Sequence, residues 1–104
     1  LRWYRPGWGF YNRRMVNGAT DLGYKTVLGS VYPYDANLPN QVAGVDFILR
    51  YVMDNVHPGA IVVLHDGLDE RARLVDVLQK LLPALEAQGY QFKTLTELET
   101  FCSQ

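Results

Sequence analysis

The feature that most constrains the fold is an almost uninterrupted apolar run at residues 60–64, which leads directly into His65, Asp66 and Gly67. Such a run without polar alternation is typical of a parallel strand that is covered on both faces. Parallel neighbours need crossover connections, which are usually helices. The run therefore favours an α/β chain in which strands and helices alternate.

The rest of the chain shows this alternation. The pattern predicts strands at residues 1–4, 25–31, 60–64 and 90–95, and helices that begin after Asn12, after Pro39, near Glu70 and at a capping box formed by Thr96 and Glu99. Gly23, His57-Pro58-Gly59 and Gly89 are expected to end the first three of these helices. We expect a mainly parallel sheet with right-handed crossovers.

Helical spacing identifies the inward face of two helices. The second helix presents a row of valines and a leucine: Val42, Val45, Leu49, Val52 and Val56. The third presents leucines: Leu74, Leu78, Leu81, Leu82 and Leu85. Within this third helix, Pro83 is expected to bend or restart the chain.

The length and the charge of the chain limit the number of domains and the classes of partner that it can have. A chain of 104 residues forms one domain at most. Its net charge of -1 and the lack of a basic run argue against nucleic acid or an anionic membrane as a partner. No stretch approaches the roughly 18 apolar residues of a membrane span. Since the chain has no initiating methionine, we expect Leu1 to lie inside a longer gene product.

The sequence motifs and the numbers of histidine and cysteine residues argue against several kinds of catalytic or metal site. The chain has no CxxC, HExxH, P-loop or GxGxxG sequence. It holds two histidines and one cysteine, so a zinc site within the chain would have to rely heavily on carboxylates. Cys102 excludes an internal disulfide, and we expect it to be a half-buried apolar residue near the end of the last helix.

Chemistry-bearing residues follow the first three predicted strands. These segments are Arg-Pro-Gly-Trp-Gly at residues 5–9, Tyr-Pro-Tyr-Asp-Ala at residues 32–36 and His-Asp-Gly at residues 65–67. The carboxyl ends of parallel strands meet at one edge of the sheet, where α/β proteins place their functional sites. We therefore expect a single site at this edge.

Each candidate residue has a functional and a structural interpretation. His65 can act as a general acid or base, or can be a loop histidine bonded to backbone. Arg5 can pair with a carboxylate or an anionic intermediate, or can be solvated. Trp8 can shape a sugar site or belong to the core, and Asp35 can face the site or form an Asx turn. His57, beside a helix end, is expected to be structural.

Together, the three segments resemble the polysaccharide deacetylases of the NodB homology fold, carbohydrate esterase family 4. Arg-Pro-Gly-Trp-Gly resembles the third motif of that family, Tyr-Pro-Tyr-Asp-Ala the fourth, and Ile-Val-Val-Leu-His-Asp-Gly, residues 61–67, the fifth. Residues 90–98 are similar to the closing strand and helix. The resemblance implies a partial (β/α) barrel of about four βα units with a mainly parallel sheet. Residues 1–104 would be the C-terminal half of such a domain, with the N-terminal half absent.

The resemblance also implies an activity. Family members use a metal-bound water to hydrolyse acetamide groups on N-acetylated sugars. The family's motifs that carry the catalytic base and the metal ligands are not in this sequence. We therefore expect zinc or another divalent metal in the intact domain, none held by this chain alone, and no activity from this chain alone. The implied partners are an N-acetylated glycan and the missing N-terminal half, and the implied location is extracytoplasmic or secreted.

By the same resemblance, residues receive roles one at a time. His65 would be the general acid that protonates the leaving amine, and Arg5 would orient the absent catalytic aspartate. The backbone N–H of Trp8 would help to hold the oxyanion. Val63 stands where the family places a leucine against the acetyl methyl group, and Leu64 is expected to point to the other face.

Several positions depart from the family pattern. Gly7 replaces a proline, Ala36 replaces the tryptophan that walls the substrate groove, and Tyr32 replaces the aspartate that supports the catalytic histidine. The support of His65 therefore has three possible sources: Asp35, Asp66 or the missing half. Two other functions stay open, namely a catalytically dead relative that binds glycan and a fold remnant that self-associates through exposed edges.

Overall fold

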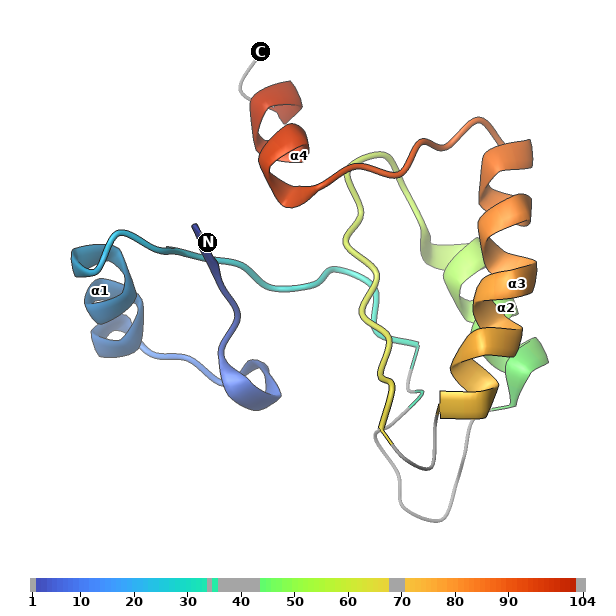
Figure 1. Ribbon diagram of the computed structural model, residues 1–104, viewed down its shortest axis with the longest axis horizontal. Helices are drawn as coiled ribbons and strands as arrows, with labels where there is room; N and C mark the ends of the chain where they lie inside the picture. Colours follow the sequence, from blue (N-terminus) through green and yellow to red (C-terminus); the bar gives the residue numbers. More distant parts are fainter. Residues whose placement is uncertain (1, 34, 36–43, 68–70, 103–104) are drawn as a thin grey trace.

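The computed structural model describes residues 2–33, 35, 44–67 and 71–102. Its elements, in chain order, are strand β1 (Trp3–Tyr4), the 3₁₀ turn η1 (Gly7–Gly9), helix α1 (Arg13–Asp21), strand β2 (Lys25–Thr26) and helices α2 (Val45–Asn55), α3 (Arg71–Ala87) and α4 (Leu95–Cys102). They pack in two groups, with β1, β2 and α1 on one side, where α1 packs against β2, and α2 against α3 on the other (Figure 1).

Parallel pairing joins segments that are distant in the sequence, as the apolar pattern predicts. Strand β1 pairs with β2 in parallel, with Trp3 opposite Lys25 and Tyr4 opposite Thr26. Further along the chain, Val31 and Val62 form an isolated parallel bridge. Residues 60–64 thus lie beside the segment that follows β2, which connects the two packed groups.

The expected strands at 25–31 and 60–64 are much shorter than the sequence suggests. In the backbone, Val31 N–H donates a hydrogen bond to Ile61 O at 3.1 Å, and Val63 N–H donates one to Val31 O at 3.0 Å. The Ile61 N–H, however, donates to the hydroxyl of Ser30 at 2.9 Å. A side-chain oxygen thereby replaces a backbone acceptor, which ends the regular ladder after a single bridge.

Helices α1 and α3 end as the glycines predict. Asn12 caps α1, since its side-chain oxygen accepts the Met15 N–H at 2.9 Å. Gly23 and Gly89 both adopt positive φ, 87° and 89°, directly after α1 and α3. After α3, Gly89 N–H donates to Glu86 O and Tyr90 N–H to Leu85 O, the paired bonds of a Schellman motif. A left-handed residue at this position explains why glycine terminates each helix.

The main core lies between α2, α3 and the bridged segment. Its buried members are Val31, Ile48, Val52, Val77, Leu81 and Leu85. The predicted row of α2 is confirmed, since Val52 is buried and Val45, Leu49 and Val56 pack against the core. Ile48 was not expected, and Val42 lies outside the described residues. The prediction for Leu82 is wrong: it is 40% exposed, and Val77 takes a buried place instead. Neighbouring residues on a helix point about 100° apart, so Leu81 and Leu82 cannot share one face.

In the last third of the chain, neither a restart of the helix at Pro83 nor a strand at residues 90–95 is found. Helix α3 continues through Pro83 without a restart, because Leu81 and Leu85 on either side are anchored in the core. No strand forms at 90–95: Tyr90 belongs to the cap of α3, and Leu95 already begins α4. Only Gln91–Lys93 remain between the two caps, and these exposed residues form no strand pairing within the described part of the chain.

The capping box of α4 lies two residues earlier than expected. Thr94 Oγ1 accepts the Glu97 N–H at 3.2 Å and donates to Glu97 Oε1 at 3.1 Å. The predicted pair, Thr96 and Glu99, instead docks α4 on the strands. The indole N–H of Trp3 donates to Thr96 Oγ1 at 3.1 Å, and Glu99 pairs with Lys25 and, at 3.8 Å, with Arg2.

This docking makes part of the stability depend on pH. The hydrogen bond from Lys25, aided by the charges of Lys25 and Arg2, holds the pKa of Glu99 below its ordinary value. The contribution of Glu99 is therefore complete above the unfolded-state pKa of about 4.3 and is lost as pH falls through the lower folded-state value. In urea titrations, Glu99→Gln should be less stable than wild type at pH 7 and equal to it in strong acid. Glu86→Gln, at an exposed position on α3, is the matched control, and equal behaviour of the two variants would contradict the prediction.

The chain as a whole is open in shape. Its radius of gyration is 15.3 Å, whereas a compact domain of this length has about 13 Å. Large apolar side chains are exposed on several elements: Trp8, Phe10, Leu22, Phe92 and Phe101. None of the helices in the described part of the chain has the length and apolar character to cross a bilayer.

Candidate functional site

The centre of the candidate site is a hydrogen-bonded pair, Asp35 and His65. Asp35 Oδ1 lies 2.8 Å from His65 Nδ1, and Asp35 Oδ2 accepts the backbone N–H of His65 at 2.6 Å. His65 follows the segment that bridges to Val31, and Asp35 follows Val31 itself, so the parallel bridge brings the two together. Of the three possible supports for His65, the structure places Asp35 against the ring.

Burial divides the pair into an inner and an outer member. The side chain of Asp35 is 5% exposed, and that of His65 is 39% exposed. Since a carboxylate accepts hydrogen bonds, Nδ1 of His65 is the donor and Nε2 is the nitrogen left to exchange a proton. This arrangement, with a buried carboxylate that orients a half-exposed imidazole, suits a general acid or base.

Arg73, which the sequence analysis did not select, also belongs to this cluster. Arg73, on α3, donates through Nη2 to the backbone carbonyl of Asp35. In the sequence it is one of several arginines near a helix start. The only signal for it was its place on the helix that follows His-Asp-Gly.

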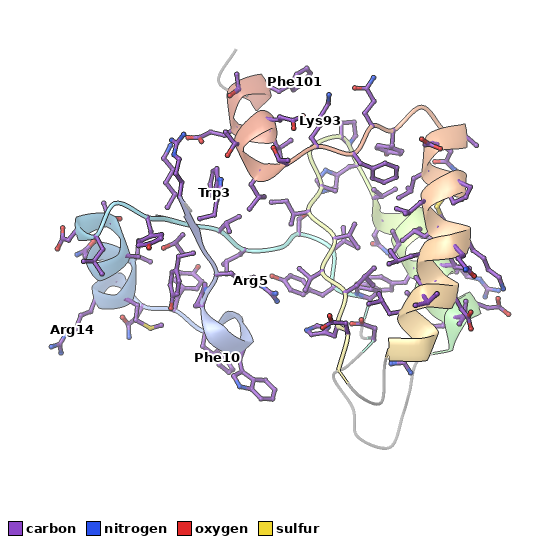
Figure 2. All side chains as sticks on the ribbon, viewed as in Figure 1. Trp3, Arg5, Phe10, Arg14, Lys93 and Phe101 are labelled. Atoms are coloured by element: carbon purple, nitrogen blue, oxygen red, sulfur yellow. The ribbon has the colours of Figure 1, made fainter. Side chains whose placement is uncertain are left out.

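Arg5, which follows β1, is the next candidate residue. It lines a cavity of about 370 Å³ together with Gly29, Val63 and Leu64, the last two of which directly precede His65. Figure 2 shows its side chain extending from the end of β1 toward the middle of the molecule. The cavity therefore contacts the segment that leads into His65, while His65 itself is not among the described residues that line it.

The residues that precede His65 pack in different directions. Val63 is 7% exposed and lies close to Gly29, while Leu64 packs against the core of α2 and α3. Tyr32, in place of the family's aspartate, uses its hydroxyl to accept the Gly29 N–H at 2.8 Å. Tyr32 therefore supports the backbone beside Val63 and does not bond the imidazole.

Gly29 is required by this packing. A Cβ at residue 29 would overlap the Cγ2 methyl of Val63 and lie 3.1 Å from the ring carbon and hydroxyl of Tyr32. We expect Gly29→Ala to lower the free energy of unfolding by about 1–3 kcal/mol through overpacking. Gly18→Ala is the control, since a Cβ there meets nothing within 4 Å on α1 and should stabilise by about 0.5–1 kcal/mol. Urea denaturation of both variants tests this, and a neutral Gly29→Ala would contradict it.

Trp8 lies on the turn after β1 in an unusual backbone conformation. Its φ is 60°, and its side chain is 95% exposed. Pro6 before it is buried, and bonds from Gly9 N–H to Pro6 O and from Phe10 N–H to Gly7 O close the turn. A bulky residue in the left-handed region is strained, and such strain is concentrated at functional loops. Trp8 is not among the described residues that line the Arg5 cavity.

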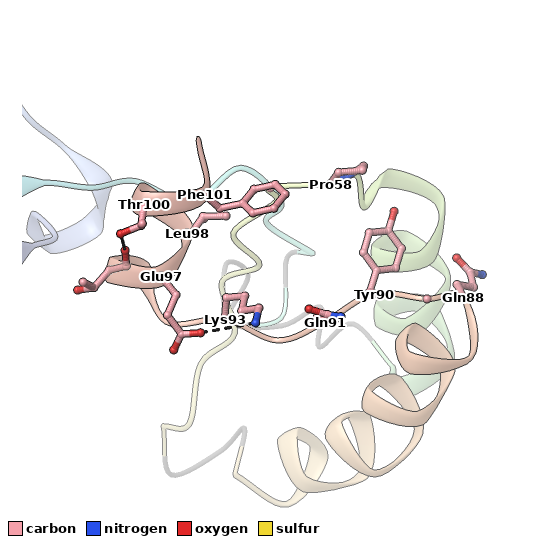
Figure 3. A pocket seen from close by; sticks show the side chains of 12 residues that line it. Pro58, Gln88, Tyr90, Gln91, Lys93, Glu97, Leu98, Thr100 and Phe101 are labelled. Carbon is pink, nitrogen blue, oxygen red and sulfur yellow. Dashed lines mark hydrogen bonds and ion pairs between the residues drawn. The ribbon is translucent and has the colours of Figure 1, made fainter. Parts of the chain in front are cut away.

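A larger hollow, of about 810 Å³, lies elsewhere, between the connection from α3 to α4 and α4 itself (Figure 3). Its lining includes Pro58, Tyr90, Lys93, Glu97 and Phe101. Lys93 and Glu97 form an ion pair of 3.8 Å at its side. None of the residues that the sequence analysis selected for a site lies in its lining, so size alone does not identify the site.

No family model matches the chain, but individual proteins do. Over 95 residues it is 40% identical to a peptidoglycan-N-acetylglucosamine deacetylase of Bacillus cereus, a match that covers 91% of this chain and 44% of that protein. It is 29% identical over 106 residues to a chitooligosaccharide deacetylase of Azorhizobium caulinodans, covering 91% of this chain and 49% of the relative. The chain thus spans less than half the length of these relatives.

Solved structures give the same result. A carbohydrate esterase family 4 pseudoenzyme from Bacillus anthracis superposes with a TM-score of 0.80 at 31% identity, covering 94% of this chain and 32% of that one. A peptidoglycan N-acetylglucosamine deacetylase has the same TM-score at 27% identity, covering 93% and 44%. Sequence and structure therefore confirm the resemblance: this chain is a homologue of the polysaccharide deacetylases of carbohydrate esterase family 4.

Proposed function

We propose that this chain is the C-terminal half of a metal-dependent polysaccharide or chitooligosaccharide deacetylase domain, a hydrolase of acetamide groups on N-acetylated sugars. The observation that carries the proposal is the Asp35–His65 pair, in which His65 directly follows Val63 and Leu64 of the cavity that Arg5 also lines. The relatives named above support it, because both are deacetylases of amino-sugar glycans.

The proposed chemistry assigns one proton transfer to this chain. Hydrolysis of an acetamide adds water to the carbonyl carbon and breaks the C–N bond, and the amine needs a proton to leave. His65 supplies this proton from Nε2 while Asp35 holds Nδ1, an arrangement that general acid catalysis requires. Arg5 orients the catalytic aspartate of the other half, and the Trp8 N–H helps to hold the oxyanion. Val63 borders the acetyl methyl group.

The metal ligands of the proposed enzyme would lie outside this chain. Among the described residues, no group of His, Cys, Asp and Glu side chains could hold a metal ion, so these residues do not fit a metal centre by themselves. One structural neighbour was crystallised with an N-hydroxybenzamide, and hydroxamates are metal-chelating groups. This supports a metal in that relative, and we place the corresponding ligands in the N-terminal half of the present domain.

The open shape of the chain supports a larger domain. Met15 and Leu22, on the apolar side of α1, are 38% and 78% exposed. Exposed apolar surface of this kind usually marks an interface. We propose that the N-terminal half covers these surfaces and completes a (β/α) barrel, of which this chain supplies a part. Self-association through the same surfaces is the alternative, which sedimentation of the isolated chain would reveal as an oligomer.

A catalytically dead, glycan-binding relative is the second candidate. Tyr32 replaces the family's supporting aspartate, and a structural neighbour is a pseudoenzyme, of which a mutant with restored activity has also been solved. The Asp35–His65 bonds argue for activity, because a carboxylate from another position supports the imidazole. Sugar binding without any loss of acetyl groups would favour this second candidate.

The deciding experiment measures acetate release from N-acetylglucosamine oligomers with added zinc or cobalt. We expect turnover by the full-length protein, loss of turnover with a chelator, and none by residues 1–104 alone. Metal-dependent turnover by residues 1–104 alone would contradict the assignment of the ligands to the other half. Absence of turnover by the full-length protein would contradict the enzyme proposal itself.

A further inference from the structure

Arg73 makes an unusual contact with the loop that carries Asp35. Its half-buried guanidinium donates through Nη2 to the Asp35 carbonyl, from 38 residues away in the sequence. Its other terminal nitrogen, Nη1, is buried without a hydrogen-bond partner among the described residues. Burying part of a guanidinium in this way costs free energy. A long, charged side chain kept here at such a cost needs a reason beyond filling space.

The bonds around Asp35 form a continuous chain from α3 to the imidazole. Arg73 holds the carbonyl of Asp35, and the carboxylate of the same residue holds both the N–H and the ring of His65. The buried Pro33 lies two residues before Asp35 in the sequence. Helix α3 is itself anchored in the core by Val77 and Leu81. These hydrogen bonds connect the imidazole to α3 through Asp35.

We propose that Arg73 is a positioning residue for His65 and acts through Asp35. The proposal rests on the proposed function, in which His65 transfers a proton. The guanidinium holds the Asp35 peptide against α3, so that the carboxylate keeps Nδ1 occupied and Nε2 directed outward. Arginine suits this task because its planar fork is more preorganised than an ammonium group.

The test uses the full-length protein with Arg73→Gln, Arg73→Lys and Asp35→Asn. The matched control is Arg50→Gln, at an exposed arginine on α2. Two readouts are compared: the NMR resonance of the His65 Nδ1 proton, and kcat and KM for acetate release. We expect Arg73→Gln to lose the slowly exchanging Nδ1 resonance and to lower kcat about 10–100-fold, with KM changed by less than about twofold. Arg73→Lys should restore part of both signals, and Arg50→Gln should resemble wild type.

Combining the Arg73 and Asp35 substitutions distinguishes a positioning role of Arg73 from a general effect on stability. If Arg73 acts through Asp35, adding Arg73→Lys to Asp35→Asn should lower kcat no further than Asp35→Asn alone. An Arg73→Gln protein that keeps the resonance and the kcat of wild type would overturn the proposal, as would fully additive losses in the double variant. Should Arg73→Gln not fold, the lysine variant and the double variant decide. Should wild type release no acetate, the proposed function fails, and the Nδ1 resonance still decides the role of Arg73.

Discussion

Replacing His65 with alanine is expected to reduce the proposed acetate release by the full-length protein about 10²–10⁴-fold, the usual contribution of a positioned general acid. The loss should appear in kcat, because the proton is needed when the C–N bond breaks and little is lost in substrate binding. Folding should change little, since the imidazole is 39% exposed and lies at the surface side of the pair.

The second histidine of the chain provides the control. His57 is exposed after α2, and its Nδ1 contacts the neighbouring Pro58 carbonyl at 3.0 Å. His57→Ala should therefore leave both kcat and KM near the wild-type values. Equal losses in the two variants, or an unaffected His65→Ala, would remove His65 from the reaction. Acetate release at saturating oligosaccharide, with circular dichroism to verify folding, distinguishes these results.

Replacing Leu81 with alanine is expected to lower the free energy of unfolding by about 2–5 kcal/mol, the usual range for a leucine buried in a packed core. Leu81 is 2% exposed and lies among Val52, Val77 and Leu85, where rigid neighbours limit collapse into the space left. Against a total stability of about 5–15 kcal/mol, this loss is large.

Leu82, the neighbouring residue on α3, provides a control within the same helix. Leu82 is 40% exposed, so Leu82→Ala removes little buried surface and raises helix propensity slightly. We expect it to change the free energy of unfolding by less than about 1 kcal/mol. Urea unfolding at constant m-value tests the pair. A loss at Leu82 equal to that at Leu81 would show that this face of α3 is covered in solution.

Much of the fold could be predicted where one local rule acts alone. Gly23 and Gly89 end their helices because the left-handed conformation after a helix favours glycine. Asn12 begins α1 for an equally local reason. By contrast, Thr94–Glu97 and Thr96–Glu99 both fit the capping-box pattern. Which pair forms the capping box depends on Trp3, because its indole N–H donates to the Thr96 hydroxyl from 93 positions away in the sequence.

The candidate site shows the same division. The positions of His65 and Asp35 after parallel segments could be predicted, because the edge of a sheet follows from topology. The partner of the imidazole could not, since Asp35 and Asp66 were both available and only the bridge between Val31 and Val62 selects the former. Arg73 was missed because its bond is to a carbonyl, and backbone acceptors leave no trace in side-chain motifs.

The turn at Trp8 has a consequence for which sequences can persist there. Glycine would adopt a φ of 60° without strain, whereas an L-residue gives up about 1–2 kcal/mol. The indole is almost fully solvated and makes little contribution to the core. The strained backbone and the solvated indole together mean that Trp8 adds little to the stability of this chain by itself.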